Sequence, residues 1–125
     1  MNIPEKLLYT KDHEWLKCEG DEALIGITDY AQSELGDIIF AEMPSIGDAF
    51  DKEVAFGTVE AVKAVSEVFL PVAGEVIDVN ADLTDKPELI NEDPYGAGWM
   101  VRLRLKNPAD VEGLMDAAAY NQFIQ

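Results

Sequence analysis

Lys63 is the side chain in this sequence best placed to carry chemistry, because it stands almost alone. It lies in "GTVEAVKAVSEVFLPVAGEV", from Gly57 to Val76, and is the only basic residue between Lys52 and Lys86. An amine on a flexible four-carbon stem can pair with a carboxylate, or it can be acylated to a neutral amide. Lys63 is therefore either an ion-pair partner or a point of covalent attachment.

Independent catalysis and metal binding find little support in the residue types. There is no G-x-S-x-G motif and no glycine-rich phosphate loop, and the chain has a single histidine, His13, and a single cysteine, Cys18. We expect His13 to pack or to form a hydrogen bond rather than to catalyse. The run "DVNADL" from Asp78 matches the opening of a calcium loop, but Leu83 and Leu89 replace the turn glycine and the bidentate glutamate. The sequence predicts neither an enzyme nor a metal site.

Length, composition and charge limit the classes of protein that remain. A chain of 125 residues with 48% hydrophobic residues predicts one globular domain over 1–125. The formal charge of −16 would repel nucleic acid, and it suits either electropositive protein partners or a plain solvated surface. The start "MNIPEKLLYT" has no signal-peptide pattern, no apolar run could span a membrane, and a lone cysteine fits a reducing compartment. These features predict a cytoplasmic protein.

Turn signals separate many short segments that are rich in β-formers. The expected strands are 14–17, 23–27, 37–43, 53–60, 66–70, 75–79 and 99–105. In the last of them, apolar side chains at odd positions from Trp99 to Leu105 alternate with Met100 and two arginines, which predicts one buried face. Many short strands in a small domain predict a sandwich or a barrel.

Helices are expected in two places, one within the β body of residues 7–106 and one after it. A short helix opens at Thr28 or Asp29, which can cap it, and stops at Gly36. The tail over 108–125 has few β-branched residues, so it reads as helical with a break at Gly113. We expect this tail to pack on the β body.

The segment around Lys63 is locally ambiguous. "VEAVKAV" is rich in helix formers, and Val59, Val62 and Val65 recur at a spacing of three residues, which favours one or two helical turns. The strand-rich flanks favour a β-hairpin instead. Local reasoning leaves both interpretations open.

Four blocks of the sequence resemble, in order, the H-protein family of the glycine cleavage system. The blocks are "YTKDHEWL" (9–16), "IGITDYAQSELGDIIFAEMPSIGD" (25–48), "GTVEAVKAVSEVFLPVAGEVIDVN" (57–80) and "ELINEDPYGAGWM" (88–100). The resemblance implies a mainly β, barrel-sandwich hybrid of the lipoyl/biotinyl type, with short peripheral helices and a C-terminal helix. It also places Lys63 at the tip of a hairpin and implies that Lys63 carries lipoic acid in amide linkage.

The resemblance implies roles for several carboxylates. Glu60 and Glu67 are expected to guide the lipoylating enzyme, a lipoate ligase or octanoyltransferase, unless they are ordinary exposed acids. Glu14, with Asp12 and Glu67 as weaker candidates, is expected to line a cleft that holds the loaded, cationic arm. Ala61 stands where the family usually has serine, and small side chains at Ala61 and Ala64 are expected to leave room at the tip.

The implied function is that of a non-catalytic carrier. Such a protein takes the aminomethyl group of glycine from a pyridoxal-phosphate decarboxylase to a tetrahydrofolate-dependent aminomethyltransferase, and then passes electrons to a flavin-dependent dihydrolipoyl dehydrogenase. We expect it to act as a monomer. An alternative within the same class is an H-like protein that donates lipoyl groups to other enzymes.

Overall fold

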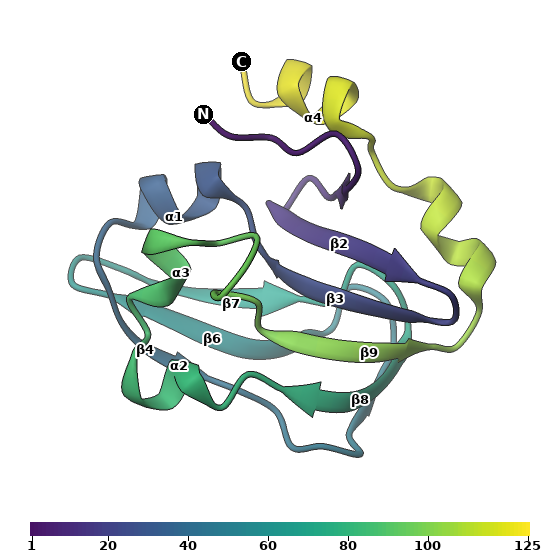
Figure 1. Ribbon diagram of the computed structural model, residues 1–125, viewed down its shortest axis with the longest axis horizontal. Coiled ribbons are helices and arrows are strands. Elements are labelled where there is room, and N and C mark those ends of the chain that lie inside the picture. Colours follow the sequence, from purple (N-terminus) through teal and green to yellow (C-terminus); the bar gives the residue numbers. More distant parts are fainter.

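Two antiparallel β-sheets form the body of the protein in the computed structural model, which describes residues 1–125 (Figure 1). The larger sheet consists, in spatial order, of β1 (Leu8–Tyr9), β2 (Glu14–Glu19), β3 (Glu22–Ile27), β9 (Val101–Leu105), β8 (Gly74–Val79) and β5 (Ala49–Phe50). The smaller sheet consists of β4 (Ile38–Glu42), β6 (Ala55–Ala61) and β7 (Val65–Phe69). The predicted flattened, mainly β sandwich is confirmed.

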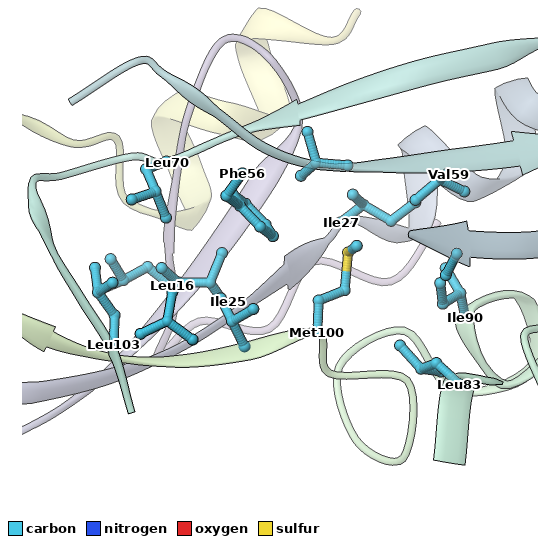
Figure 2. Close-up of a cluster of buried hydrophobic side chains, with 14 of the residues drawn as sticks. Leu16, Ile25, Ile27, Phe56, Val59, Leu70, Leu83, Ile90, Met100 and Leu103 are labelled. Atoms are coloured by element: carbon cyan, nitrogen blue, oxygen red, sulfur yellow. The ribbon is translucent and has the colours of Figure 1, made fainter. Parts of the chain in front are cut away.

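Apolar side chains from the facing sides of the two sheets form the main core. Figure 2 shows Leu16, Ile25 and Leu103 of the larger sheet in one cluster with Phe56 and Val59 of the smaller sheet. Because side chains alternate along a strand, a regular strand such as β9 gives every second residue to this layer. Full burial of one such aliphatic side chain stabilises the fold by roughly 1.5–3 kcal/mol.

The C-terminal tail covers part of the outer face of the larger sheet. It consists of a 3₁₀ helix, η1 (Pro108–Gly113), and α4 (Ala117–Phe123). Tyr9 and Met115 exchange two backbone hydrogen bonds of 2.8 and 2.9 Å, which join the tail to β1. Beneath α4 lies a second apolar cluster of Leu7, Tyr9, Trp15 and Tyr120. Strand β2 is therefore buried on both faces where it begins, and the tail packs on the β body as expected.

The first helix forms where its caps predict. Helix α1 spans Asp29–Leu35, the side chain of Thr28 accepts a hydrogen bond from the Ala31 amide, and Gly36 follows with a φ of 82°. Glycine adopts that conformation far more readily than other residues.

Two further helices, α2 (Asp82–Asp85) and α3 (Leu89–Glu92), were not expected from the sequence. Each has four residues, so neither is long enough to show a helical period. Leu83 of α2 and Ile90 of α3 enter the main core beside Met100 (Figure 2).

The predicted strand over 99–105 is partly wrong. Strand β9 begins at Val101, and its alternation holds from there to Leu105. Met100, expected on the solvent side, is completely buried. The reason is that α2 and α3 cap this end of the sandwich and enclose the Met100 side chain.

Asn80 holds the acidic turn that resembles the start of a calcium loop. Its side-chain amide donates hydrogen bonds of 2.8 Å to the backbone carbonyls of Ala97 and Trp99, and Asn80 itself is buried. No group of three or more His, Cys, Asp or Glu side chains lies close enough to hold a metal ion. Asn80 thus joins the end of β8 to the loop before β9.

Replacement of Asn80 by alanine should destabilise the protein by about 2–4 kcal/mol, because two carbonyls would lose their donors in a buried setting. Urea denaturation followed by circular dichroism measures this change. Asp85→Ala, on the exposed end of α2, is the matched control and should lie within about 0.5 kcal/mol of the parent. Equal stability of the Asn80 variant and the control would contradict this structural role.

Candidate functional site

Lys63 lies at the tip of the β6–β7 hairpin, in the turn formed by residues 62–64. The Ala61 amide donates a 2.7 Å hydrogen bond to the Ala64 carbonyl and closes the turn. The Val62 amide donates to the carbonyl of Asp37 at 3.0 Å, which ties the tip to the chain before β4. The open question about this segment is thereby answered in favour of the hairpin.

The surroundings of Lys63 leave its amine free. Its side chain is exposed, and the salt bridges of the structure join Arg102 to Glu19 and Glu22 instead. The lysine stem lies against Gly36, where an added Cβ would be 3.4 Å from Cε of Lys63, an ordinary van der Waals distance. The ion-pair interpretation of Lys63 therefore has no support in the geometry.

Asn91 of α3 supports this end of the molecule, and sequence analysis did not identify it. Its side-chain amide donates 2.9 Å hydrogen bonds to the Gly36 carbonyl and to the side chain of Gln32. Its side-chain carbonyl accepts from the amide of Ile38 at 2.9 Å. Asn91 thus links the end of α1 to the start of β4, directly beside the lysine.

Glu60 and Glu67 lie on the outer face of the smaller sheet. Glu60 pairs with Val65 across the hairpin, and Glu67 pairs with Thr58. Cross-strand partners share a face, and residues two apart along a strand do as well. Both acids therefore flank the lysine on the solvent side, and neither lines the clefts described below.

The expectation that Ala61 leaves room at the tip is wrong. Ala61 pairs with Ile38 and is buried in the main core, whereas Ala64 is exposed. The strand alternation explains the difference, because residues 59 and 61 point inward and residue 60 points outward. Of the two alanines, only Ala64 belongs to the surface of the tip.

A cleft of about 300 Å³ contains two of the three predicted docking carboxylates, Asp12 and Glu14, whereas Glu67 does not line it. Its lining includes residues of the C-terminal tail, Leu114, Met115 and Phe123. Lys11, Lys52 and Glu53 also line it, so the cleft carries both signs of charge.

Glu14 is the buried carboxylate of this cleft, with 2% of its surface exposed. The Thr10 hydroxyl donates to Oε1 at 2.7 Å and the Phe69 amide donates to Oε2 at 3.3 Å. Burial raises the pKa of Glu14 to about 7, although both hydrogen bonds favour the ionised form. The neighbouring charge of Asp12 raises the pKa further. Glu14 thus changes its charge close to neutral pH.

A second cleft of about 320 Å³ lies beside the start of β7. It is lined by Asp12, His13, Tyr30, Ala31, Glu34, Leu35 and Ser66. Asp12 lines both clefts. From Val65 to Phe69 the strand covers about 13 Å, and the Phe69 amide bonds to Glu14. The edge of β7 therefore leads from the lysine tip towards Glu14.

His13 fastens the C-terminal helix to the wall of the second cleft. Its Nδ1 lies 2.8 Å from the Tyr120 hydroxyl, which lies 2.8 Å from the hydroxyl of Thr28. Burial lowers the pKa of His13, while Asp12 and Glu34 act in the opposite sense. His13 has the hydrogen-bonding role expected for a lone histidine. Tyr120 was not predicted, since its partner is distant in the sequence.

Fold and site together define a class of protein: a flattened two-sheet body that presents one unpaired lysine on an exposed hairpin, as lipoyl-type carriers do. The sequence profile described as "Glycine cleavage H-protein" matches residues 7–125. The chain belongs to the glycine cleavage H-protein family.

Individual relatives agree with this assignment over the whole chain. A glycine cleavage system H protein of Halothermothrix orenii is 50% identical over 125 residues, covering 100% of this chain and 98% of the relative. That of Chlorobium luteolum is 56% identical over 126 residues, covering 99% and 98%. The crystal structure of a glycine cleavage system H protein from Mycobacterium marinum superposes with a TM-score of 0.88 at 35% identity, covering 96% and 97% of the two chains.

Membership of this family makes the protein a lipoyl carrier of the glycine cleavage system, as the resemblance implied. None of its helices combines the length and the apolar character that crossing a lipid bilayer requires.

The raised pKa of Glu14 predicts a specific pH dependence of stability. The folded state holds the proton more tightly than the unfolded chain, so stability should fall as pH rises from about 4.5 to 7. This contribution amounts to about 3 kcal/mol. Glu14→Gln, which cannot ionise, should lack it.

Urea denaturation of both proteins at about pH 5 and about pH 8 measures the difference. The variant should gain stability relative to the parent at the higher pH. Parallel profiles for parent and variant would show that Glu14 titrates normally.

Proposed function

We propose that Lys63 carries lipoic acid in amide linkage and that the protein presents this arm to the other components of the glycine cleavage system. The observation behind the proposal is one exposed, unpaired lysine at a hairpin tip in a chain of this family. Formation of the amide needs an activated acyl group, which a lipoate ligase or octanoyltransferase would supply.

The residues present fit such an arm. Acylation removes the positive charge of Lys63, and the exposed neighbours Val62 and Val65 are apolar, so a neutral amide suits the tip. When bound, the lipoyl group supplies a dithiolane that accepts an aminomethyl group on sulfur and carries two electrons.

Glu14 and Asp12 are proposed to hold the loaded arm. The aminomethyl group carries an amine that is cationic at neutral pH, and a nearby carboxylate stabilises a cation. Glu14 is buried and held by two hydrogen bonds, so its carboxylate is oriented before the arm arrives. Leu114, Met115 and Phe123 bring apolar surface to the same cleft and would restrict the access of water.

The protein is proposed to be a non-catalytic carrier in a bacterial-type cytoplasm. Its partners would be the pyridoxal-phosphate glycine decarboxylase, the tetrahydrofolate-dependent aminomethyltransferase and the flavin-dependent dihydrolipoyl dehydrogenase. One tethered group then visits three active sites at a high effective concentration. The charge of −16 favours rapid, salt-sensitive encounters with electropositive partners.

Reconstitution with the purified partner enzymes tests this function. The lipoylated protein should support glycine-dependent release of carbon dioxide, and Lys63→Arg should abolish it because arginine cannot form the amide. Lys86→Arg, which keeps Lys63, should behave as the parent. A lipoylated protein that fails with the decarboxylase yet passes its lipoyl group to other enzymes would favour the relay function instead.

Glu14→Ala tests the docking of the loaded arm. Loss of the carboxylate should shorten the lifetime of the aminomethyl-loaded protein about tenfold, which corresponds to 1.4 kcal/mol of lost interaction. The decay is followed by intact-mass spectrometry. Glu75→Ala removes an exposed acid from β8 and should leave the lifetime unchanged. An unaltered lifetime in the Glu14 variant would rule out the docking role.

A further inference from the structure

Exposed apolar side chains gather around the lysine hairpin. Of the eight large apolar side chains that are exposed, four lie here: Ile39 (53%), Phe40 (50%), Val62 (73%) and Val65 (64%). We call these four residues the tip patch. The core does not use them, and a contiguous exposed apolar patch marks a binding site more often than scattered apolar residues do.

A β-bulge in β4 creates half of the tip patch. Ile38 pairs with Ala61 and Phe40 pairs with Glu60, so the register shifts at Ile39. In a regular strand consecutive side chains would alternate between core and solvent, whereas here Ile39 and Phe40 are both exposed. A bulge of this kind changes the direction in which a side chain points, so two consecutive side chains are exposed here.

The hairpin contributes Val62 and Val65, the other two residues of the tip patch, and both are close to Lys63 in the sequence. Phe40 pairs with Glu60, and Glu60 pairs with Val65, so one cross-strand row runs over the outer face of the smaller sheet. Val62 and Val65 lie one and two residues from Lys63 in the sequence. The turn therefore brings Lys63 to the end of the sheet that carries the tip patch.

Acidic residues lie among and beside the residues of the tip patch. Glu60 lies within the row, and the next row across the sheet places Glu42 and Glu67 on either side of Thr58. Apolar side chains with acids among and beside them are complementary to a partner whose contact surface combines apolar side chains with Lys and Arg.

We propose that the tip patch is the docking surface for the enzyme that acylates Lys63, and that the active-site entrance of this enzyme combines apolar side chains with Lys and Arg. The proposal rests on the lipoylation of Lys63 proposed above. It commits to the acylating enzyme because of where the reacting atom lies. Nζ is four carbons from the backbone, so the enzyme must cover the tip itself. For enzymes that act later, the reacting atom is at the far end of the lipoyl arm, so it does not itself direct them to the tip.

The chemical step itself needs no side chain of the patch. The Lys63 ammonium loses a proton, and its nitrogen attacks the carbonyl carbon of an acyl adenylate. The C–N bond forms, the bond from the carbonyl carbon to phosphate oxygen breaks and AMP leaves, while the nitrogen loses a second proton to become a neutral amide. The patch contributes apolar contact area that holds the amine at the donor and excludes water.

Acylation kinetics test the proposal on the full-length, unmodified protein. The assay supplies a lipoate ligase, ATP and lipoic acid, and intact-mass spectrometry follows the conversion at increasing carrier concentration. The double variant Ile39→Ser/Phe40→Ser should lower kcat/KM about tenfold, chiefly by raising KM, as expected for loss of central interface contacts. Ile46→Ser is the matched control, because Ile46 is 63% exposed but lies in the loop between β4 and β5. It should stay within about twofold of the parent.

Val62→Ser provides a second, independent reading, since a turn residue exposed to this extent can be exchanged with little risk to the fold. If the double variant fails to fold, the Val62 variant decides alone, with the same expected rise in KM.

Normal kcat/KM in the folded patch variants would overturn the docking proposal while leaving the lipoylation of Lys63 intact. A parent protein that is never acylated on Lys63 would overturn the proposed function first. The docking proposal would also be overturned if the parent were a dimer and the double variant a monomer with unchanged acylation. The tip patch would then join two copies of the chain.

Discussion

The register of the β6–β7 hairpin is the constraint on which the rest of the site depends. Val59 and Ala61 point into the core, so Glu60 between them must point to solvent. A slip of one residue would reverse every side chain, burying Glu60 and exposing the two apolar residues. The cost of burying an unpaired carboxylate excludes that alternative. The packing of the sandwich therefore determines that the turn falls at residues 62–64, with Lys63 at its apex.

The remaining parts of the site are fastened to this hairpin from different directions. Asn91 of α3 joins the end of α1 to the start of β4 beside the tip. At the other end of β7, the Phe69 amide meets the carboxylate of Glu14 from β2. The C-terminal tail closes the Glu14 cleft with apolar residues and is itself held by Tyr120 against His13 and Thr28. A long covalent arm on Lys63 would thus start at the exposed hairpin tip, at one end of β7. The charged, partly enclosed Glu14 cleft lies further along the same strand.

Local sequence patterns predict the scaffold better than the site. Alternating and β-rich segments locate most strands, and the caps at Thr28 and Gly36 locate α1. The four-residue helices α2 and α3 have no period to detect, and the enclosure of Met100 follows from them. The spacing of the valines does not decide between a helix and a hairpin around Lys63. Packing against the opposing sheet selects the hairpin.

The family resemblance identifies Lys63 and Glu14 by position, but the physical state of Glu14 is not visible in the sequence. Burial in the folded chain raises its pKa, and the hydrogen bonds from Thr10 and from Phe69, which is 55 residues away, oppose that shift. The tip patch is equally hidden, since a bulge in β4 is a property of the pairing and not of the letters "IIF".

The central claim is that Lys63 is the attachment point of a covalent lipoyl arm. The most direct measurement is peptide mass spectrometry of the protein isolated from its native cells, directed at the peptide that contains Lys63. The account predicts the mass increase of one lipoyl amide on Lys63 and on no other lysine. An unmodified Lys63 in cells that lipoylate their other carrier proteins would contradict it.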